Sequence, residues 1–313
     1  VITPEKVENI RRNLSVLGLF SSVKVTPFIV NRGKDEDIFL VNLLIRAQEK
    51  EFGSVEVAPG YRTDIGVKFS TALTYNNLWG MNRSSTIEGQ VNQRLDFANL
   101  DSRRRAEKKR LLEYFLIANY NEPYLFGYDL DFDLTLDFQR KRFFGFDADI
   151  FRFSPEFGCS FTDEISASLR YQFETITQFD ASEDRDDDNF RIGSITPTLN
   201  FDFRDNPLNP TNGAFFGLSW EVANPAIFSL EDEDLVVDFY KLSSLKHFYK
   251  SMSDQWTLAT SFVFGYEKNL ATELLSDENG DPVLNEDGSQ KTRGFIPSIK
   301  VFRLDGIRSV RGF

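Results

Sequence analysis

Few residues of this sequence have the types and spacing that catalysis or metal binding requires. His247 is the only histidine, so a Ser–His nucleophile or a histidine-bound metal would depend on it alone. The nearest group of carboxylates along the chain consists of Asp129, Asp131, Asp133 and Asp137. Their spacing places them along one face of a strand, and no acid/base pair stands out among them. The sequence therefore predicts neither a catalytic nor a metal site.

The remaining candidates for ligand binding are weak. Residues 277–281 read DENGD and partly resemble a calcium loop, but the terminal bidentate glutamate is missing, so a solvated loop is favoured. Cys159 is the single cysteine, which excludes an internal disulfide. The net charge of −12 argues against nucleic acid as a partner. We expect a protein that is not an enzyme and needs no cofactor.

The clearest pattern in the chain is a strict alternation of apolar and polar residues over 128–139. Successive side chains of a strand point to opposite faces, so this segment predicts a strand with one apolar and one acidic face. A soluble sandwich and a membrane barrel would both produce such a strand. The apolar face, which we expect to contact lipid, consists of Tyr128, Leu130, Phe132, Leu134, Leu136 and Phe138.

The repetition and length of such segments favour the membrane barrel. Similar alternation recurs at 67–76, 165–174 and 256–266, and about eleven strands follow from Gly53 onward. Most have ten residues or more, whereas sandwich strands usually have about five or six. No apolar run approaches the roughly 20 residues of a membrane helix, so any membrane contact must come through strands. The 32 phenylalanines suit a lipid-facing surface.

The first fifty residues differ from the rest and predict a small α+β module. Thr3 can cap a helix whose first position is Pro4, and the helix would end at Gly18. The apolar stripe of this helix consists of Val7, Ile10, Leu14 and Leu17. Two strands would follow at 22–30 and 38–49, joined by a polar turn.

Three motifs together resemble a known family. Residues 17–20 read LGLF and are followed by VKV at 23–25. Residues 202–213 read DFRDNPLNPTNG, and residues 310–313 read VRGF, preceded by RLDG at 303–306. In this order, and with this number of strands between them, the motifs resemble the last POTRA module and the barrel of the outer-membrane assembly proteins, the BamA and TamA superfamily. The resemblance covers essentially the whole chain.

The resemblance implies an all-β transmembrane antiparallel barrel, with about eleven of sixteen strands present, preceded by a small α+β POTRA module. Residues 1–51 would be the C-terminal part of the last POTRA module. Residues 52–313 would be the N-terminal part of the outer-membrane β-barrel, ending in the sixth outer loop. The edges of an open sheet leave backbone groups unsatisfied in lipid, so we expect further strands that close the barrel. The resemblance implies five more strands downstream and more POTRA modules upstream.

The family motifs also indicate candidate site residues. The strand-turn motif would lie on the periplasmic side, and it consists of Asp202, Arg204, Asp205, Asn206, Pro207, Pro210 and Gly213. Asp202 and Arg204 would form an internal ion pair. The loop motif consists of Val310, Arg311, Gly312 and Phe313. In relatives its arginine pairs inside the barrel with an acidic group on a later strand. A glycine pair common before this motif in relatives is Asp305 and Gly306 here, which leaves the backbone conformation of that loop open.

Two further sets of residues are candidate contact sites. The first barrel strand contains proline and glycine, which weaken pairing and suit an edge strand at a lateral gate. Its gate residues are Gly53, Val55, Val57, Pro59, Gly60 and Tyr61. Counting strands places a basic cluster on the outer side, where it would contact lipopolysaccharide phosphates or form a solvated loop. This cluster consists of Arg103, Arg104, Arg105, Lys108, Lys109 and Arg110.

The resemblance implies an outer-membrane insertase, BamA-like or TamA-like, that folds and inserts β-barrel proteins by strand templating at the lateral gate. Two alternatives stay open: a two-partner secretion transporter that exports a soluble partner through the lumen, and the barrel of a patatin-like lipase fusion. The POTRA module would lie in the periplasm. The implied partners are nascent outer-membrane β-barrel proteins and outer-membrane lipids or lipopolysaccharide. Periplasmic lipoproteins would join them in the BamA-like case, or an inner-membrane-anchored partner in the TamA-like case.

Overall fold

The computed structural model describes most of the chain. The described residues are 3–32, 39–62, 66–93, 112–142, 146–179, 189–232, 235–253, 255–275, 281–284, 290–297 and 299–302. Among these residues, no helix combines the length and the apolar character that crossing a membrane requires.

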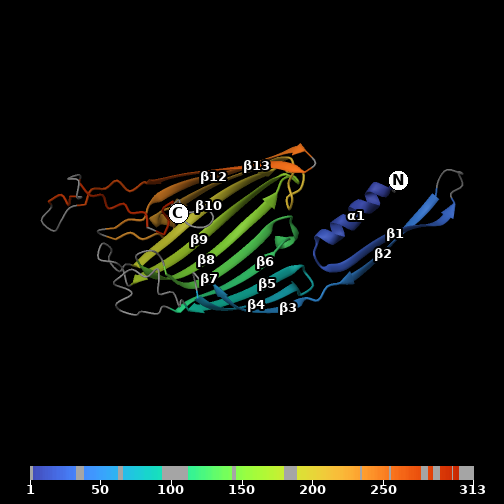
Figure 1. The fold of residues 1–313 in the computed structure, drawn as a ribbon, viewed down its shortest axis with the longest axis horizontal. Coiled ribbons are helices and arrows are strands. Elements are labelled where there is room, and N and C mark those ends of the chain that lie inside the picture. Colours follow the sequence, from blue (N-terminus) through green and yellow to red (C-terminus); the bar gives the residue numbers. More distant parts are fainter. Residues whose placement is uncertain are drawn as a thin grey trace.

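The N-terminal part forms a helix and a two-stranded sheet, as the sequence predicts. Helix α1 (Pro4–Val16) begins after Thr3, whose hydroxyl accepts a backbone N–H at 3.3 Å. Gly18, just after the helix, has a φ of 72°, which glycine adopts without steric cost. Strands β1 (Phe20–Arg32) and β2 (Phe39–Glu49) then pair antiparallel. These three elements lie beyond one end of a much larger sheet (Figure 1).

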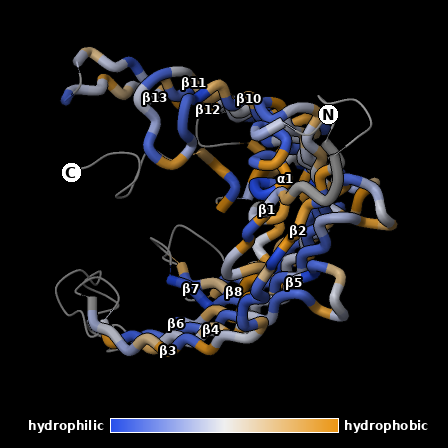
Figure 2. The backbone as a smooth tube through the Cα atoms, turned by 90° about the vertical axis from the view of Figure 1, so that its right-hand side faces the viewer, coloured by the Kyte–Doolittle hydropathy of each residue, from blue (hydrophilic) through white to orange (hydrophobic). Residues whose placement is uncertain are grey.

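The larger sheet has eleven antiparallel strands, and each pairs with its neighbours in chain order. The prediction of about eleven strands from Gly53 onward is confirmed. Their lengths run from 10 to 15 residues. The strands are β3 (Gly53–Arg62), β4 (Gly66–Leu78), β5 (Arg83–Gln93), β6 (Leu112–Glu122), β7 (Asp131–Arg142), β8 (Asp147–Ser160), β9 (Ile165–Phe179), β10 (Asn189–Asp202), β11 (Gly213–Ala223), β12 (Phe239–Ser253) and β13 (Trp256–Asn269). Figure 2 shows the sheet curving so that β3 and β13 lie on opposite sides of an opening.

The two faces of the curved sheet differ in what covers them. We call the face against which residues 295–302 pack the inner face, and the opposite one the outer face. On β7, Asp137 is buried on the inner face, whereas the next residue, Phe138, is 48% exposed on the outer face. Leu136 lies opposite Phe153 of β8, so the outer apolar positions continue across neighbouring strands. Alternation along each strand therefore separates a polar inner face from an apolar outer face.

The predicted start of the strand at Tyr128 is wrong by three residues. Strand β7 begins at Asp131, because a short 3-10 turn, η1 (Leu125–Gly127), occupies the residues before it. Phe126 has a φ of 54°, and the chain then turns so that the N–H of Leu125 donates to the carbonyl of Leu130 at 2.9 Å. Tyr128 is 73% exposed in this turn. The apolar face of the strand itself is therefore shorter than the sequence pattern.

A cluster of buried apolar side chains covers the inner face at the end of the sheet distant from α1. Its members are Phe146, Ala148, Ile150, Ile176, Phe190, Ile192, Ala223, Val237 and Phe239. Phe295, Ile296 and Ile299, which follow β13 in the sequence, pack against it. The rings of Phe190 and Phe295 stack at 5.2 Å. Burial of these apolar side chains therefore holds the segment after β13 on the inner face.

The connection between β11 and β12 folds back onto β10. It contains the 3-10 helix η2 (Pro225–Ile227). The Ser229 hydroxyl accepts the N–H of Gly193 at 3.1 Å and donates to its carbonyl at 2.8 Å. A Cβ at position 193 would lie 1.6 Å from the carbonyl oxygen of Ile227. Only glycine therefore permits this close approach.

Candidate functional site

A chain of ion pairs crosses the inner face from β7 to β9. Asp137 lies opposite Arg152 of β8 in the strand register, and Arg152 lies opposite Glu174 of β9. The Arg152 guanidinium donates to Asp137 Oδ2 and to Glu174 Oε1, both at 2.9 Å. The Glu174 side chain is only 1% exposed. A buried carboxylate needs such partners, because its desolvation is otherwise uncompensated.

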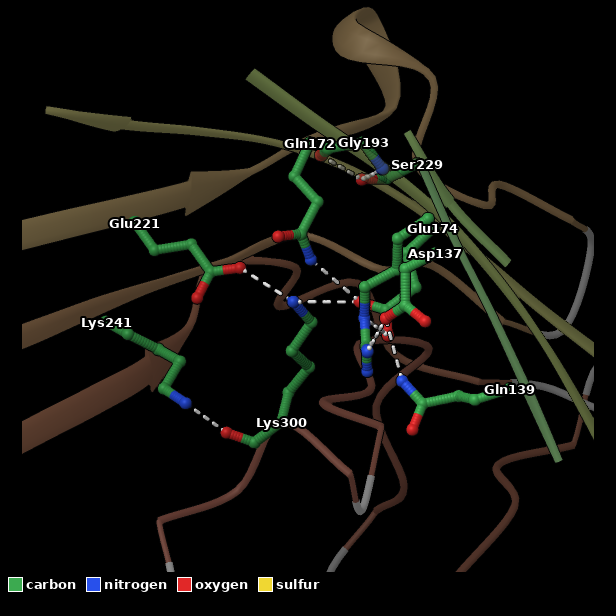
Figure 3. A network of polar contacts seen from close by, with 10 residues as sticks. Asp137, Gln139, Gln172, Glu174, Gly193, Glu221, Ser229, Lys241 and Lys300 are labelled. Carbon is green, nitrogen blue, oxygen red and sulfur yellow. Dashed lines mark hydrogen bonds and ion pairs between the residues drawn. The ribbon is translucent and has the colours of Figure 1, made fainter. Parts of the chain in front are cut away.

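Lys300 extends this chain from the segment after β13. Its Nζ lies 3.0 Å from Glu174 Oε2 and 3.0 Å from Glu221 Oε1 on β11 (Figure 3). Burial lowers the pKa of the Lys300 ammonium, but the two carboxylates outweigh burial and raise this pKa above its usual value. The Lys241 ammonium of β12 donates to the Lys300 carbonyl. A single lysine thus bridges two strands that are separated by β10.

Two amides add hydrogen bonds to the buried carboxylates. Gln139 donates to Asp137 at 2.8 Å, and Gln172 donates to Glu174 at 3.0 Å (Figure 3). We call the set Asp137, Arg152, Glu174, Glu221, Lys241 and Lys300 the inner network. Within the described part of the chain, no group of His, Cys, Asp and Glu side chains could hold a metal ion. The inner network consists of carboxylates, one guanidinium and two lysine side chains, and its ion pairs and hydrogen bonds position these groups relative to one another.

The strand-turn motif forms a compact hydrogen-bonded turn between β10 and β11, the eighth and ninth strands of the sheet. Asp202 and Arg204 form the expected ion pair, with Arg204 Nε donating to Asp202 Oδ1 at 2.7 Å. Arg204 also donates to the carbonyl of Pro207 at 3.1 Å. Gly213 has a φ of 105°, and a Cβ there would lie 2.2 Å from the carbonyl oxygen of Phe203. The turn therefore requires glycine at this position.

Asp205 organises the middle of the turn. Its carboxylate accepts the Thr211 N–H at 3.0 Å and the Thr211 hydroxyl at 2.5 Å. These bonds, with that of the Thr211 hydroxyl foremost, lower the pKa of Asp205 to about 2. Asn206 acts similarly, because its side-chain oxygen accepts the N–H groups of Leu208 and Asn209 at 2.9 and 3.2 Å. The motif thus supplies the acceptors that fix its own backbone.

We expect Asp205→Ala to raise hydrogen exchange of the Thr211 amide by about tenfold, because its acceptor disappears. Thr211→Val is the matched control, since it keeps the acceptor of that amide and removes only the hydroxyl. The pKa of Asp205 is depressed, so its stabilising effect is complete above the ordinary value of 3.8 and disappears as the pH falls through about 2. Mass-detected exchange across this range measures both effects. Equal protection in Asp205→Ala and the native protein would contradict the role of this carboxylate.

Strand β3 exposes one edge of its backbone. The N–H of Asn76 donates to the carbonyl of Phe52 at 2.7 Å, and hydrogen-bonded pairs alternate along an antiparallel ladder. The odd-numbered residues of β3 therefore direct their backbone groups away from β4. Among them, Val55 and Val57 are 70% and 59% exposed, and Pro59 has no N–H to donate. In the described part of the chain, β3 pairs with β4 alone.

All the residues of the predicted gate lie on β3, namely Gly53, Val55, Val57, Pro59, Gly60 and Tyr61. The other candidate sites of the sequence have ordinary surroundings or fall outside the structure. His247 lies on β12 with its ring 6.0 Å from that of Phe215 and 6.4 Å from that of Tyr249. Asp133 accepts a hydrogen bond from Asn121 at 2.9 Å. The basic cluster 103–110, residues 303–306 and the loop motif 310–313 lie outside the described residues, as does most of 277–281.

The inner network was not predicted from the sequence. Glu174 was recognised only as a polar member of an alternating strand, and Lys300, which follows β13, was not singled out. The signal that could have indicated the network is the presence of opposite charges in mid-strand on successive strands, as with Arg152 and Glu174. The strand register that brings these charges together cannot be read from alternation alone.

Comparisons with known proteins agree with this architecture. The model of the Omp85 superfamily domain matches residues 61–313. No curated protein matches the chain. A structure of BamA from Haemophilus ducreyi lacking POTRA domains 1–3 superposes with a TM-score of 0.62 and 15% identity, covering 98% of this chain and 53% of that one. CdiB from Escherichia coli superposes with a TM-score of 0.51 and 14% identity, covering 88% and 50%. The chain thus spans about half the length of either structure.

Proposed function

Since the chain belongs to the Omp85 superfamily, we propose that it is part of an insertase that folds β-barrel proteins into the bacterial outer membrane. The reaction is templated strand addition without covalent chemistry. An incoming chain pairs with an exposed strand edge, and main-chain hydrogen bonds guide it into the growing sheet. Its clients are nascent outer-membrane β-barrel proteins. BamA-like and TamA-like assembly proteins share this scheme, and the proposal applies to both.

The backbone edge of β3 that faces away from β4, which has no strand partner among the described residues, is the observation that supports this proposal most directly. Its odd-numbered residues present N–H and C=O groups away from β4, while Val55 and Val57 present apolar side chains on the outer face. Such an edge pairs with an extended chain whose apolar residues alternate. Pro59 removes one donor and weakens the pairing, which suits a seam that must open again.

The covering of the inner face supports lateral insertion over export through the lumen. The apolar cluster and the inner network together hold residues 295–297 and 299–302 against β8 to β12. A chain that crossed the lumen there would displace a packed apolar cluster and separate buried ion pairs, both of which cost free energy. Insertion at the β3 edge leaves both the apolar cluster and the buried ion pairs in place.

The remaining assignments extend the proposal. Residues 1–51 are the end of a POTRA module in the periplasm, and residues 52–313 form the barrel part. The turn 203–212 then lies on the periplasmic side and the basic cluster 103–110 on the outer side, where its cations contact lipopolysaccharide phosphates. Partners in the periplasm are lipoproteins in a BamA-like system or an inner-membrane-anchored protein in a TamA-like one.

The test is site-specific photocrosslinking in the full-length protein reconstituted in liposomes with an unfolded client barrel. A probe at Val57 should give at least about fivefold more client adduct than one at Thr71, its direct neighbour on β4. Both positions lie on the outer face, so the comparison isolates the edge. Equal adducts at the two positions would reject the β3 template. Adducts from the inner-face Ser243 of β12 alone would instead favour export through the lumen.

A further inference from the structure

The charged ammonium group of Lys300 lies in an unusual place, because it is largely buried between two strands. It is fixed between Glu174 on β9 and Glu221 on β11, at 3.0 Å from each, although it belongs to neither strand. Its side chain is 12% exposed, and that of Glu174 is 1% exposed. A lysine loses considerable side-chain entropy and hydration in such a place. Two carboxylates from different strands offset this cost, and they do so only while residue 300 stays at this position.

The residues around Lys300 reinforce the same placement. The Lys241 ammonium donates to the Lys300 carbonyl and lies 4.2 Å from the Phe302 ring centroid. The N–H of Phe302 donates to Glu267 of β13 at 3.2 Å. A Cβ at Gly265 would lie 3.0 Å from the Phe302 ring, so a glycine on β13 provides the space for this ring. Side chains of β12 and β13 therefore form a fitted position for residues 300–302 on the inner face.

The balance of charges around residues 300–302 indicates that Lys300 contributes most to holding them in place. The carboxylates there are Asp137, Glu174, Glu221 and Glu267, and the cations are Arg152, Lys241 and Lys300. Loss of one lysine leaves four acids and two cations in a place with little water. Removing one partner of a buried pair is far more costly than removing both, because it leaves the other charge uncompensated.

We propose that Lys300 is a positioning residue that docks the segment after β13 onto β9 and β11. Its partners lie on strands within this chain. It therefore anchors residues 299–302 through contacts that lie within the described part of the chain. Docking by Lys300 rests on this fold alone, whereas its effect on client assembly rests on the proposed insertase function.

The test uses the full-length protein in liposomes and measures hydrogen exchange of the peptide containing residues 295–302. Lys300→Met should raise exchange there by about tenfold, while peptides from β4 and β5 stay unchanged. Lys268→Met is the matched control, since Lys268 is an exposed lysine on the outer face of β13, and it should change nothing. Lys300→Arg keeps the charge and should preserve most of the protection.

Glu221→Gln combined with Lys300→Met separates docking from charge balance. This double variant removes both members of a pair, so the sheet should regain the stability that Lys300→Met alone loses. The peptide containing residues 295–302 should nevertheless exchange faster than in the native protein, because the Lys300 anchor is absent and only the apolar contacts of Phe295, Ile296 and Ile299 remain. Unchanged exchange in Lys300→Met, or full protection in the double variant, would overturn the docking role. Increased exchange with unaltered client assembly would retain the docking role and show that client assembly does not depend on it. Failure of the native protein to assemble the client would reject the insertase function and leave the docking role untouched.

Discussion

Replacing Arg152 with methionine is expected to lower the free energy of unfolding by about 3–5 kcal/mol. The change leaves Asp137 without its guanidinium and removes one of the two cations bound to the buried Glu174. Methionine fills a similar volume, so the loss comes from uncompensated charge and not from a cavity. Equilibrium unfolding by urea in lipid vesicles, followed by tryptophan fluorescence, measures it.

Arg170→Met is the matched control for this prediction. Arg170 pairs with Glu156 across the same two strands, β8 and β9, but its side chain is 48% exposed. An exposed pair contributes about 0–1 kcal/mol, because water solvates both charges. If Arg170→Met lowers the free energy of unfolding as much as Arg152→Met does, burial of the inner network does not increase its contribution to stability.

The second large effect is expected on the outer face. Leu136 lies in the middle of β7, on the face opposite to Asp137. If the outer face contacts lipid, Leu136→Arg should cost roughly 2–4 kcal/mol, the usual penalty for a cation near the middle of a bilayer. The same vesicle unfolding experiment measures it.

The control for the outer face is an arginine placed on the inner face nearby. Ser154 of β8 lies opposite Thr135, one position from Leu136 in the register. Ser154→Arg keeps its charge among water and polar side chains, so the loss should stay under about 1 kcal/mol. Equal losses at the two positions would contradict lipid contact and would favour water on both faces of the sheet.

The strands could be predicted from the sequence because alternation is a local property. A residue in a strand shows its face through its own type and that of its neighbours, and no tertiary contact is needed. The prediction of where β7 starts was wrong because it relied on this local signal alone. Tyr128 continues the alternation of residue types although the chain there is in a turn. Gly127, whose φ is 80°, was the local sign of that turn.

The inner network could not be predicted, because its contacts depend on register and on a long-range fold. Glu174 and Glu221 are 47 residues apart (221 − 174), and Lys300 reaches both only after β13 has been added to the sheet. The turn at 202–213 was an intermediate case. Its Asx-type hydrogen bonds are local and follow from residue types, whereas its place between the eighth and ninth strands required counting.

The side-chain contacts on the inner face are distributed unevenly among the strands, and this distribution affects how the sheet bends. The inner network and the apolar cluster join β7 to β12 on the inner face. Among the described residues, β3 to β6 are joined by their backbone ladders and by scattered side-chain bonds such as that from Asn92 to Glu113. A sheet whose side-chain contacts are concentrated on some of its strands bends more easily in the strands that have few of them. Among the described strands, bending fluctuations should therefore be larger toward β3 than in β8 to β12, which the inner-face contacts hold in shape.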